Sequence, residues 1–76
     1  MTQGHTEFSV SDLEYNLITT LSNLLQSEEV LARYTSDAEE AGESEIAESF
    51  RQLRAHNGDV AKRMRLELQR LIARND

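Results

Sequence analysis

The side chains of this sequence that could hold a metal ion or move a proton are carboxylates and imidazoles, because the chain has fourteen acidic residues, two histidines and no cysteine. Glu28 is the carboxylate whose spacing points it inward, since it lies four residues after Leu24 and three before Leu31 on one helical face. Asn57 holds the same kind of position on a second apolar stripe, four residues after Leu53. The two polar residues therefore interrupt otherwise apolar faces.

Glu28 and Asn57 are equally far from a turn centred near Gly42 and Glu43, so an antiparallel hairpin would put them at one level of its core. A buried carboxylate needs a hydrogen-bond partner, and the amide could supply one. Such a core polar layer could hold a metal or a proton inside a helical bundle. It could instead fix register and dimer geometry, as one buried Asn does in a coiled coil. We favour the structural layer, because hard metals generally need several oxygen or imidazole donors.

Three further candidates lie one position away from these stripes: Glu29, His56 and Asp59. With Glu28 they could form a metal site on the helix flank or between chains, although a lone His beside a core is more often solvated than a ligand. No phosphate-binding loop, Cys nucleophile or Ser-His-Asp arrangement can be assembled. We therefore expect no catalytic residue and no cofactor, with iron or another divalent metal as the alternative.

Two long helices must position these residues. The 76 residues include no proline and three glycines, so almost nothing interrupts a helix. Ser11 and Glu14 match a capping box, Gly42 can close the first helix, and Ser44 can cap the second. The expected parts are a flexible N-terminal arm over residues 1–10 and an all-α antiparallel hairpin over 11–76, with a helix over about 12–41, a turn at 42–44 and a helix over about 45–74.

Each expected helix carries an apolar stripe with spacings of three and four residues. The first stripe comprises Leu13, Leu17, Leu21, Leu24, Leu31 and Ala38, widened by Ile18, Leu25 and Ala32, and the second comprises Ile46, Phe50, Leu53, Val60, Met64, Leu68 and Leu71. Two helices touch along one line, which leaves the flanks of both stripes exposed to water. We therefore expect a homo-oligomer, a dimer or higher, that completes a four-helix bundle, with another protein as the alternative partner.

The formal charge of -6 argues against general affinity for nucleic acid or anionic membrane. No apolar stretch approaches the length of a membrane span and no export signal is recognisable, so we expect a soluble, cytoplasmic protein. The charge is uneven, because residues 1–50 hold eleven acids and one base while residues 51–76 hold three acids and seven bases. This asymmetry could orient one chain against another, or reflect the preference of acids and bases for opposite helix ends.

Three stretches resemble one half of a ferritin-like bundle: 28–34, 37–50 and 61–64. They combine a first-helix Glu, a Tyr a turn or two later, alanines near a Gly turn, and Ile-Ala followed by Phe on the second helix. The similarity covers about residues 15–70, and it is to rubrerythrins and to the short encapsulated ferritins that build a bundle from two hairpin chains. In that family each half supplies a first-helix carboxylate and a second-helix Glu-x-x-His pair to two irons.

The resemblance implies Glu28 or Glu29 as the first-helix carboxylate, and the inward geometry favours Glu28. Alignment on the second-helix pattern puts the Glu-x-x-His pair on Asn57 and Val60, so neither of its ligand types is present. The implied function is a non-catalytic structural or protein-interaction module that has lost its di-iron ligands. The alternative is a metal-binding or iron-oxidising bundle with its site at the dimer interface.

Overall fold

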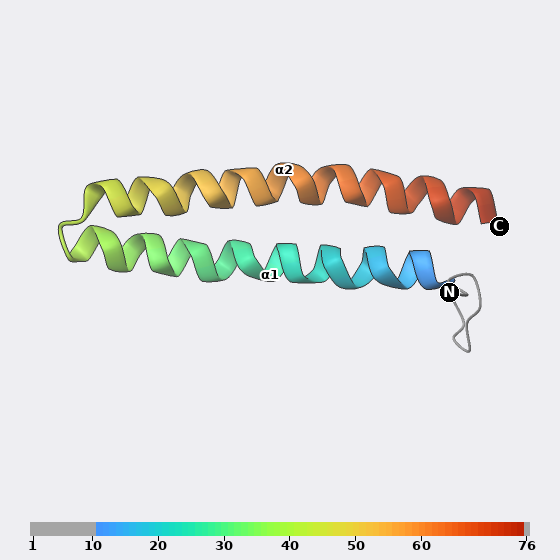
Figure 1. Ribbon diagram of the computed structural model, residues 1–76, viewed down its shortest axis with the longest axis horizontal. Helices are drawn as coiled ribbons and strands as arrows, with labels where there is room; N and C mark the ends of the chain where they lie inside the picture. The colour runs from blue at the N-terminus through green and yellow to red at the C-terminus, as the bar shows by residue number, and fades with distance from the viewer. Residues whose placement is uncertain (1–10, 76) are drawn as a thin grey trace.

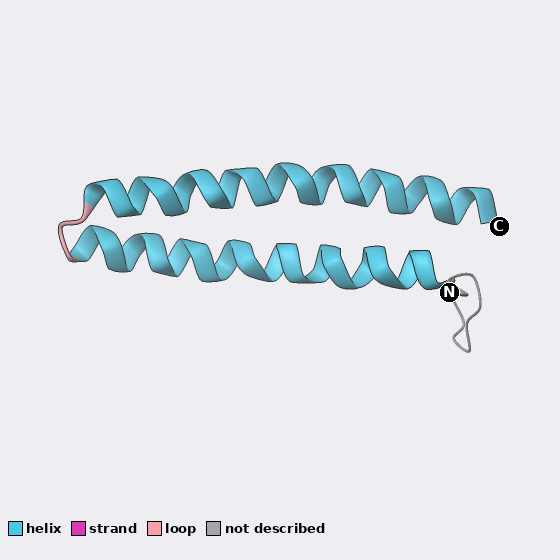
Figure 2. Cartoon of the chain, in the orientation of Figure 1, coloured by secondary structure: helices cyan, strands magenta, loops and turns pink. Residues whose placement is uncertain are grey.

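The computed structural model describes residues 11–75 as two antiparallel helices lying side by side (Figure 1). Helix α1 spans Asp12–Glu40 and helix α2 spans Ser44–Asn75, with residues 41–43 forming the turn between them (Figure 2). The rod measures 50 × 20 × 19 Å. The expected all-α two-helix hairpin is confirmed, with no strand in this range. The arm expected over residues 1–10 lies outside the described residues.

Helix α1 begins with the cap that the sequence indicates. The Ser11 hydroxyl accepts a hydrogen bond from the Glu14 backbone N–H at 3.1 Å and donates one to the Glu14 carboxylate at 3.2 Å. Asp12 and Glu14 add negative charge to the first turn, where the helix dipole favours it. The local sequence therefore fixes where α1 starts.

The turn is tight because Glu43 makes backbone hydrogen bonds both to the end of α1 and to the start of α2. Gly42 has φ +75°, and the N–H groups of Gly42 and Glu43 donate to the carbonyls of Glu39 and Ala38, which is a Schellman closure. The carbonyl of Glu43 then accepts from the Ala47 N–H at 3.0 Å, which starts α2. Glu43 thus holds the N-cap position expected for Ser44.

Alanines make up much of the seam, the line of contact between the two helices. The buried apolar side chains among the described residues are Leu31, Ala38, Ala47, Ala61 and Leu71. Ala47 and Ala61 lie outside the expected second stripe, whereas Leu13, Ile46 and Leu53, which were expected to be core residues, are about half exposed. Three of the five buried apolar side chains are therefore alanines, while large side chains of both expected stripes remain exposed.

Near the turn, an aromatic contact joins Tyr34 of α1 to Phe50 of α2. The rings of Tyr34 and Phe50 lie 5.7 Å apart with a tilt of 54°, a favourable geometry for aromatic pairs.

No helix within residues 11–75 combines the length and the apolar character that crossing a membrane requires.

Candidate functional site

Glu28 and Asn57 lie at neighbouring levels of the seam, but each faces a different residue of the opposite helix. The Asn57 side-chain amide donates a hydrogen bond to the Ser27 hydroxyl at 3.3 Å. The Glu28 Oε2 atom lies 3.7 Å from the position that a Cβ on Gly58 would take. Within residues 11–75 no hydrogen bond joins Glu28 to Asn57, and both side chains are half-buried. The direct pair expected from the sequence is therefore not formed inside one chain.

Ser27 links Asn57 to the backbone of α1. Its hydroxyl donates to the Leu24 carbonyl at 2.6 Å while it accepts from Asn57, which matches the one donor and two acceptor sites of a hydroxyl. Thr35 bonds the Leu31 carbonyl in the same way at 2.8 Å. Their own helix thus satisfies these seam hydroxyls, and no buried polar side chain in the described part of the chain lacks a partner.

Glu28 lies in a charged groove of about 580 Å³. The groove is also lined by Arg51, Arg54, Ala55, Gly58, Asp59 and Lys62. Opposite charges around a half-buried carboxylate offset part of the cost of removing it from water. The mixed charges and the width of this groove are typical of a solvated polar surface.

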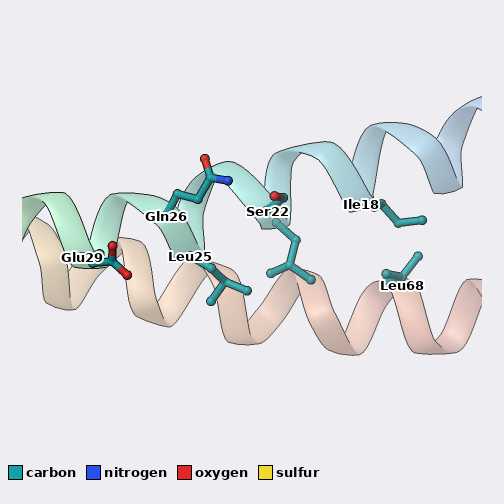
Figure 3. A pocket seen from close by; sticks show the side chains of 7 residues that line it. Ile18, Ser22, Leu25, Gln26, Glu29 and Leu68 are labelled. Atoms are coloured by element: carbon teal, nitrogen blue, oxygen red, sulfur yellow. The ribbon is translucent and has the colours of Figure 1, made fainter.

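Glu29, His56 and Asp59 are exposed, and of these three Asp59 lines the groove that holds Glu28. Glu29 lines a different groove, where Ile18 of α1 and Leu68 of α2 point toward one another (Figure 3). Over the described residues, no three His, Cys, Asp or Glu side chains come together in a way that could hold a metal ion. A metal site built from these residues would need ligands from a second chain.

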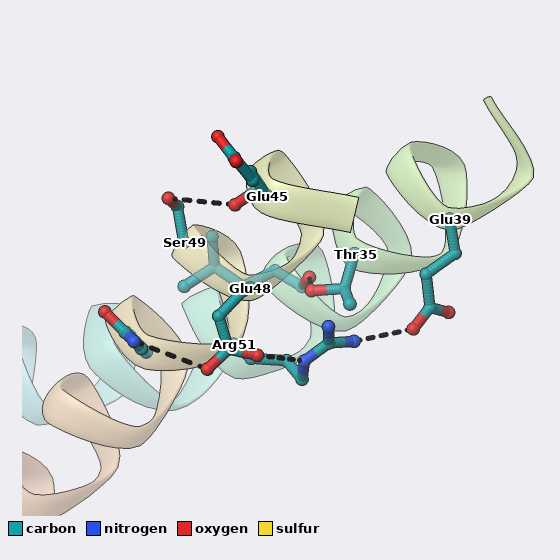
Figure 4. A network of polar contacts seen from close by, with 8 residues as sticks. Thr35, Glu39, Glu45, Glu48, Ser49 and Arg51 are labelled. Carbon is teal, nitrogen blue, oxygen red and sulfur yellow. Dashed lines mark hydrogen bonds and ion pairs between the residues drawn. The ribbon is translucent and has the colours of Figure 1, made fainter. Parts of the chain in front are cut away.

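Charged side chains contact one another around Arg51, near the turn (Figure 4). Its guanidinium binds Glu39 of α1 at 2.6 Å and Glu48 of α2 at 2.9 Å, and Gln52 donates to Glu48 at 3.3 Å. The hydrogen bond from Arg51 lowers the pKa of the Glu48 carboxyl the most, and the hydrogen bond from Gln52 lowers it further. Hydrogen bonds to Glu48 and Glu39 raise the pKa of Arg51. These side chains are exposed, so water and salt screen the pairs.

The hairpin has two sides, and residues spaced by seven define each of them, because every seventh residue returns to nearly the same side of a helix. The Tyr34 side comprises Leu13, Thr20, Ser27 and Tyr34 of α1, Ala41 of the turn, and Ile46, Leu53, Val60, Glu67 and Arg74 of α2. The Leu25 side comprises Ile18, Leu25, Ala32 and Glu39 of α1 with Arg51, Gly58, Arg65 and Ile72 of α2. The Asn57–Ser27 bond lies toward the first side, and the Glu39–Arg51 ion pair lies on the second.

Two grooves occupy opposite ends of the Tyr34 side. The turn groove, of about 360 Å³, is lined by Tyr34, Asp37, Ala38, Ala41, Glu43, Ile46 and Phe50. The end groove, of about 230 Å³, lies near the chain ends and is lined by Leu13, Leu17, Glu67, Arg70, Leu71 and Arg74. Both grooves have apolar floors with charged residues beside them.

Comparisons of this chain with protein families, with curated proteins and with solved structures gave no match. The similarity to ferritin-like bundles therefore rests on the residue pattern alone. The function must be inferred from the surfaces of the chain itself.

The sequence pattern did not single out the two grooves or the Arg51 contacts. The seven-residue spacing of Leu13, Tyr34 and Ala41 is the signal for the Tyr34 side, and the spacing of Glu48 and Arg51 by three is the signal for their ion pair. Neither signal shows by itself which residues of the other helix complete the surface.

Proposed function

We propose that this chain is a non-catalytic helical-hairpin module that acts by associating with a second copy of itself, in a structural or protein-interaction role. The observation that carries the proposal is the small core of the single chain. Leu31 and Leu71 are the two large apolar side chains that are buried within residues 11–75. Nine large hydrophobic residues are at least 38% exposed: Leu13, Tyr15, Ile18, Leu25, Tyr34, Ile46, Leu53, Leu66 and Ile72.

Covering these side chains would stabilise the assembly substantially, because each large apolar side chain contributes roughly 1.5–3 kcal/mol when fully buried. A hairpin of this size cannot fold back to cover both of its own sides. The resemblance to ferritin-like half-bundles supports the same arrangement, a four-helix bundle made from two hairpins. Asn57 and Val60, at the family's Glu-x-x-His positions, argue against its di-iron chemistry in this chain.

Light scattering coupled to size-exclusion chromatography tests this proposal. We expect a particle with twice the 8.7 kDa mass of the chain, or a higher multiple, and a melting temperature that rises with protein concentration. A monomer at every concentration, with a melting temperature that does not change, would contradict it.

One observation favours a second candidate, a metal-binding bundle. The half-buried carboxylate of Glu28 makes no hydrogen bond or ion pair within residues 11–75. Glu28 from two chains, supported by Asn57, His56 or Asp59, would then share one ion. Anaerobic titration with Fe(II) or Zn(II), with Glu28→Gln as the control, tests this candidate. Saturable binding that the substitution abolishes would support it, and equal uptake by both proteins would exclude the site.

A further inference from the structure

We propose that the second copy lies antiparallel on the Tyr34 side, so that the turn of each hairpin covers the chain ends of the other. This inference rests on the proposed self-association and specifies its surface and direction. The arrangement puts α1 over α1 and α2 over α2, related by a two-fold axis that crosses the rod near its middle.

The Tyr34 side offers apolar surface at both ends of the rod, which an antiparallel partner requires. The turn groove presents Tyr34, Ile46 and Phe50, and the end groove presents Leu13 and Leu17. Reversing the rod about its middle brings Leu13, which is 56% exposed, over the turn groove of the other copy. Each groove then receives apolar side chains from the opposite end of its partner.

The charges beside the two grooves have opposite signs. Asp37 and Glu43 line the turn groove, and no base lines it. Arg70 and Arg74 line the end groove, with Glu67 as the single acid among its lining residues. An antiparallel partner therefore brings bases to acids at both ends, whereas a turn-on-turn partner would bring acids to acids. Complementary charges of this kind select orientation more than they add affinity.

A polar, uncharged pair of side chains lies beside Leu53 and Val60 near the middle of the Tyr34 side, where the two-fold axis would cross. Ser27 and Asn57 meet there through their hydrogen bond, with Asn23 one turn away on α1. Two copies of this Ser–Asn pair would form a polar layer near the axis. A layer of this kind can fix the register of a helical bundle.

The Leu25 side is less suited to the same arrangement. Its apolar groove, with Ile18, Leu25 and Leu68, lies toward the chain ends (Figure 3). Its turn end carries Glu39 and Arg51, the ion pair shown in Figure 4. An antiparallel copy on this side would place its apolar residues over that ion pair. The ion pair would then be removed from water without gaining a new polar partner.

The size of the Tyr34 side also fits a stable dimer. A face of the 50 × 20 × 19 Å rod offers roughly 1,000 Å² of geometric area, and a standard interface buries about 800 Å² per partner. One face thus provides enough surface for a specific dimer of this chain.

Spin-label distances test the orientation directly, since the sequence has no cysteine and single labels can be added freely. With Glu40→Cys, at the end of α1, the two labels should lie about 45 Å apart in the antiparallel dimer, from 29 residues at 1.5 Å each. A turn-on-turn dimer would put them within about 25 Å, because packed helices lie about 10 Å apart. Labels at Asn23→Cys and at Ser22→Cys then show which side of the hairpin forms the interface, because Asn23 lies toward the Tyr34 side and Ser22 lines a groove of the Leu25 side. We expect the shorter label-to-label distance at position 23.

Charge reversal gives an independent test. Arg70→Glu with Arg74→Glu should raise the dimer Kd roughly tenfold or more, because several attractive surface pairs become repulsive at both ends of the dimer. Lys62→Glu with Arg65→Glu is the matched control, because it changes the net charge equally beside a groove of the Leu25 side. We expect its Kd to change less than about threefold. Mixing the first variant with Asp37→Lys and Glu43→Lys should restore a tight heterodimer.

The possible failures are distinguishable. A dimer with close Glu40 labels, or with the shorter distance at position 22, overturns the inference and leaves the proposed self-association intact. Equal weakening by both charge-reversed pairs also overturns it. A chain that stays monomeric overturns the proposed function as well, and would assign the exposed surface to a different protein.

Discussion

Replacing Gly58 by alanine should stabilise the hairpin. Gly58 lies inside α2, where glycine is about 1 kcal/mol less favourable than alanine. A Cβ at this position would have one neighbour within 4 Å, Glu28 Oε2 at 3.7 Å, which is an ordinary contact distance. Since no clash opposes the gain in helix propensity, the free energy of unfolding should rise by about 0.5–1 kcal/mol.

The same substitution at Gly42 should have the opposite sign. Gly42 has φ +75°, a left-handed conformation that costs a residue with a Cβ roughly 1–2 kcal/mol. No atom lies within 4 Å of a Cβ placed there, so the penalty comes from backbone strain alone. Gly42→Ala is therefore a matched control, because the substitution is the same but the glycine it replaces has a left-handed instead of a helical backbone conformation.

Urea and thermal unfolding at several protein concentrations would measure both effects. A change of 1 kcal/mol corresponds to about 4–8 °C in melting temperature for a domain of this size. Gly58 belongs to the Leu25 side, so Gly58→Ala should leave the dimer Kd unchanged. If it lowers stability or weakens the dimer, another chain approaches Gly58 closely, and the assignment of the interface to the Tyr34 side is refuted.

Three further predictions concern the packing, the cap and the ion pairs. Leu31→Ala should destabilise by about 2–4 kcal/mol in urea unfolding, whereas Leu66→Ala, at a site 59% exposed, should change stability by less than about 0.5 kcal/mol unless a partner covers it. Ser11→Ala should cost about 1 kcal/mol through loss of the bond to the Glu14 N–H, detected by hydrogen exchange in the first turn of α1. Because the folded-state pKa of Glu48 is lowered, its contribution to stability is present above the ordinary carboxyl pKa and is lost as pH falls through the lowered value. The free energies of unfolding of wild type and Glu48→Gln should therefore differ at neutral pH and converge in acid, once the Glu48 carboxylate is protonated.

The hairpin could be predicted because its ends carry strong local signals. Ser11 with Glu14 begins α1, Gly42 ends it, and no proline interrupts either helix. The cap of α2 differs by one residue from the prediction, which placed it at Ser44 because serine is a preferred cap. The Schellman closure leaves Glu43 in the cap position, so the geometry of the turn decides the outcome.

The contacts between the two helices could not be predicted as closely as the helix ends. A stripe of large apolar residues does not show which alanines are buried between the helices, so Ala47 and Ala61 were missed. Asn57 and Gly58 are adjacent, and a shift of one residue in the turn decides which of them meets Glu28. Partner residues across two helices depend on this register, whereas spacing along one helix does not.

The most direct test of the antiparallel dimer is an isotope-filtered NOE experiment on a mixture of labelled and unlabelled chains, which reports contacts between different copies only. Leu13 methyl groups of one chain should show cross-peaks to Ala38, Ala41 or Ile46 of the other. Cross-peaks from Ile18 and Leu25 instead, or none between chains, would contradict the assignment of the second copy to the Tyr34 side.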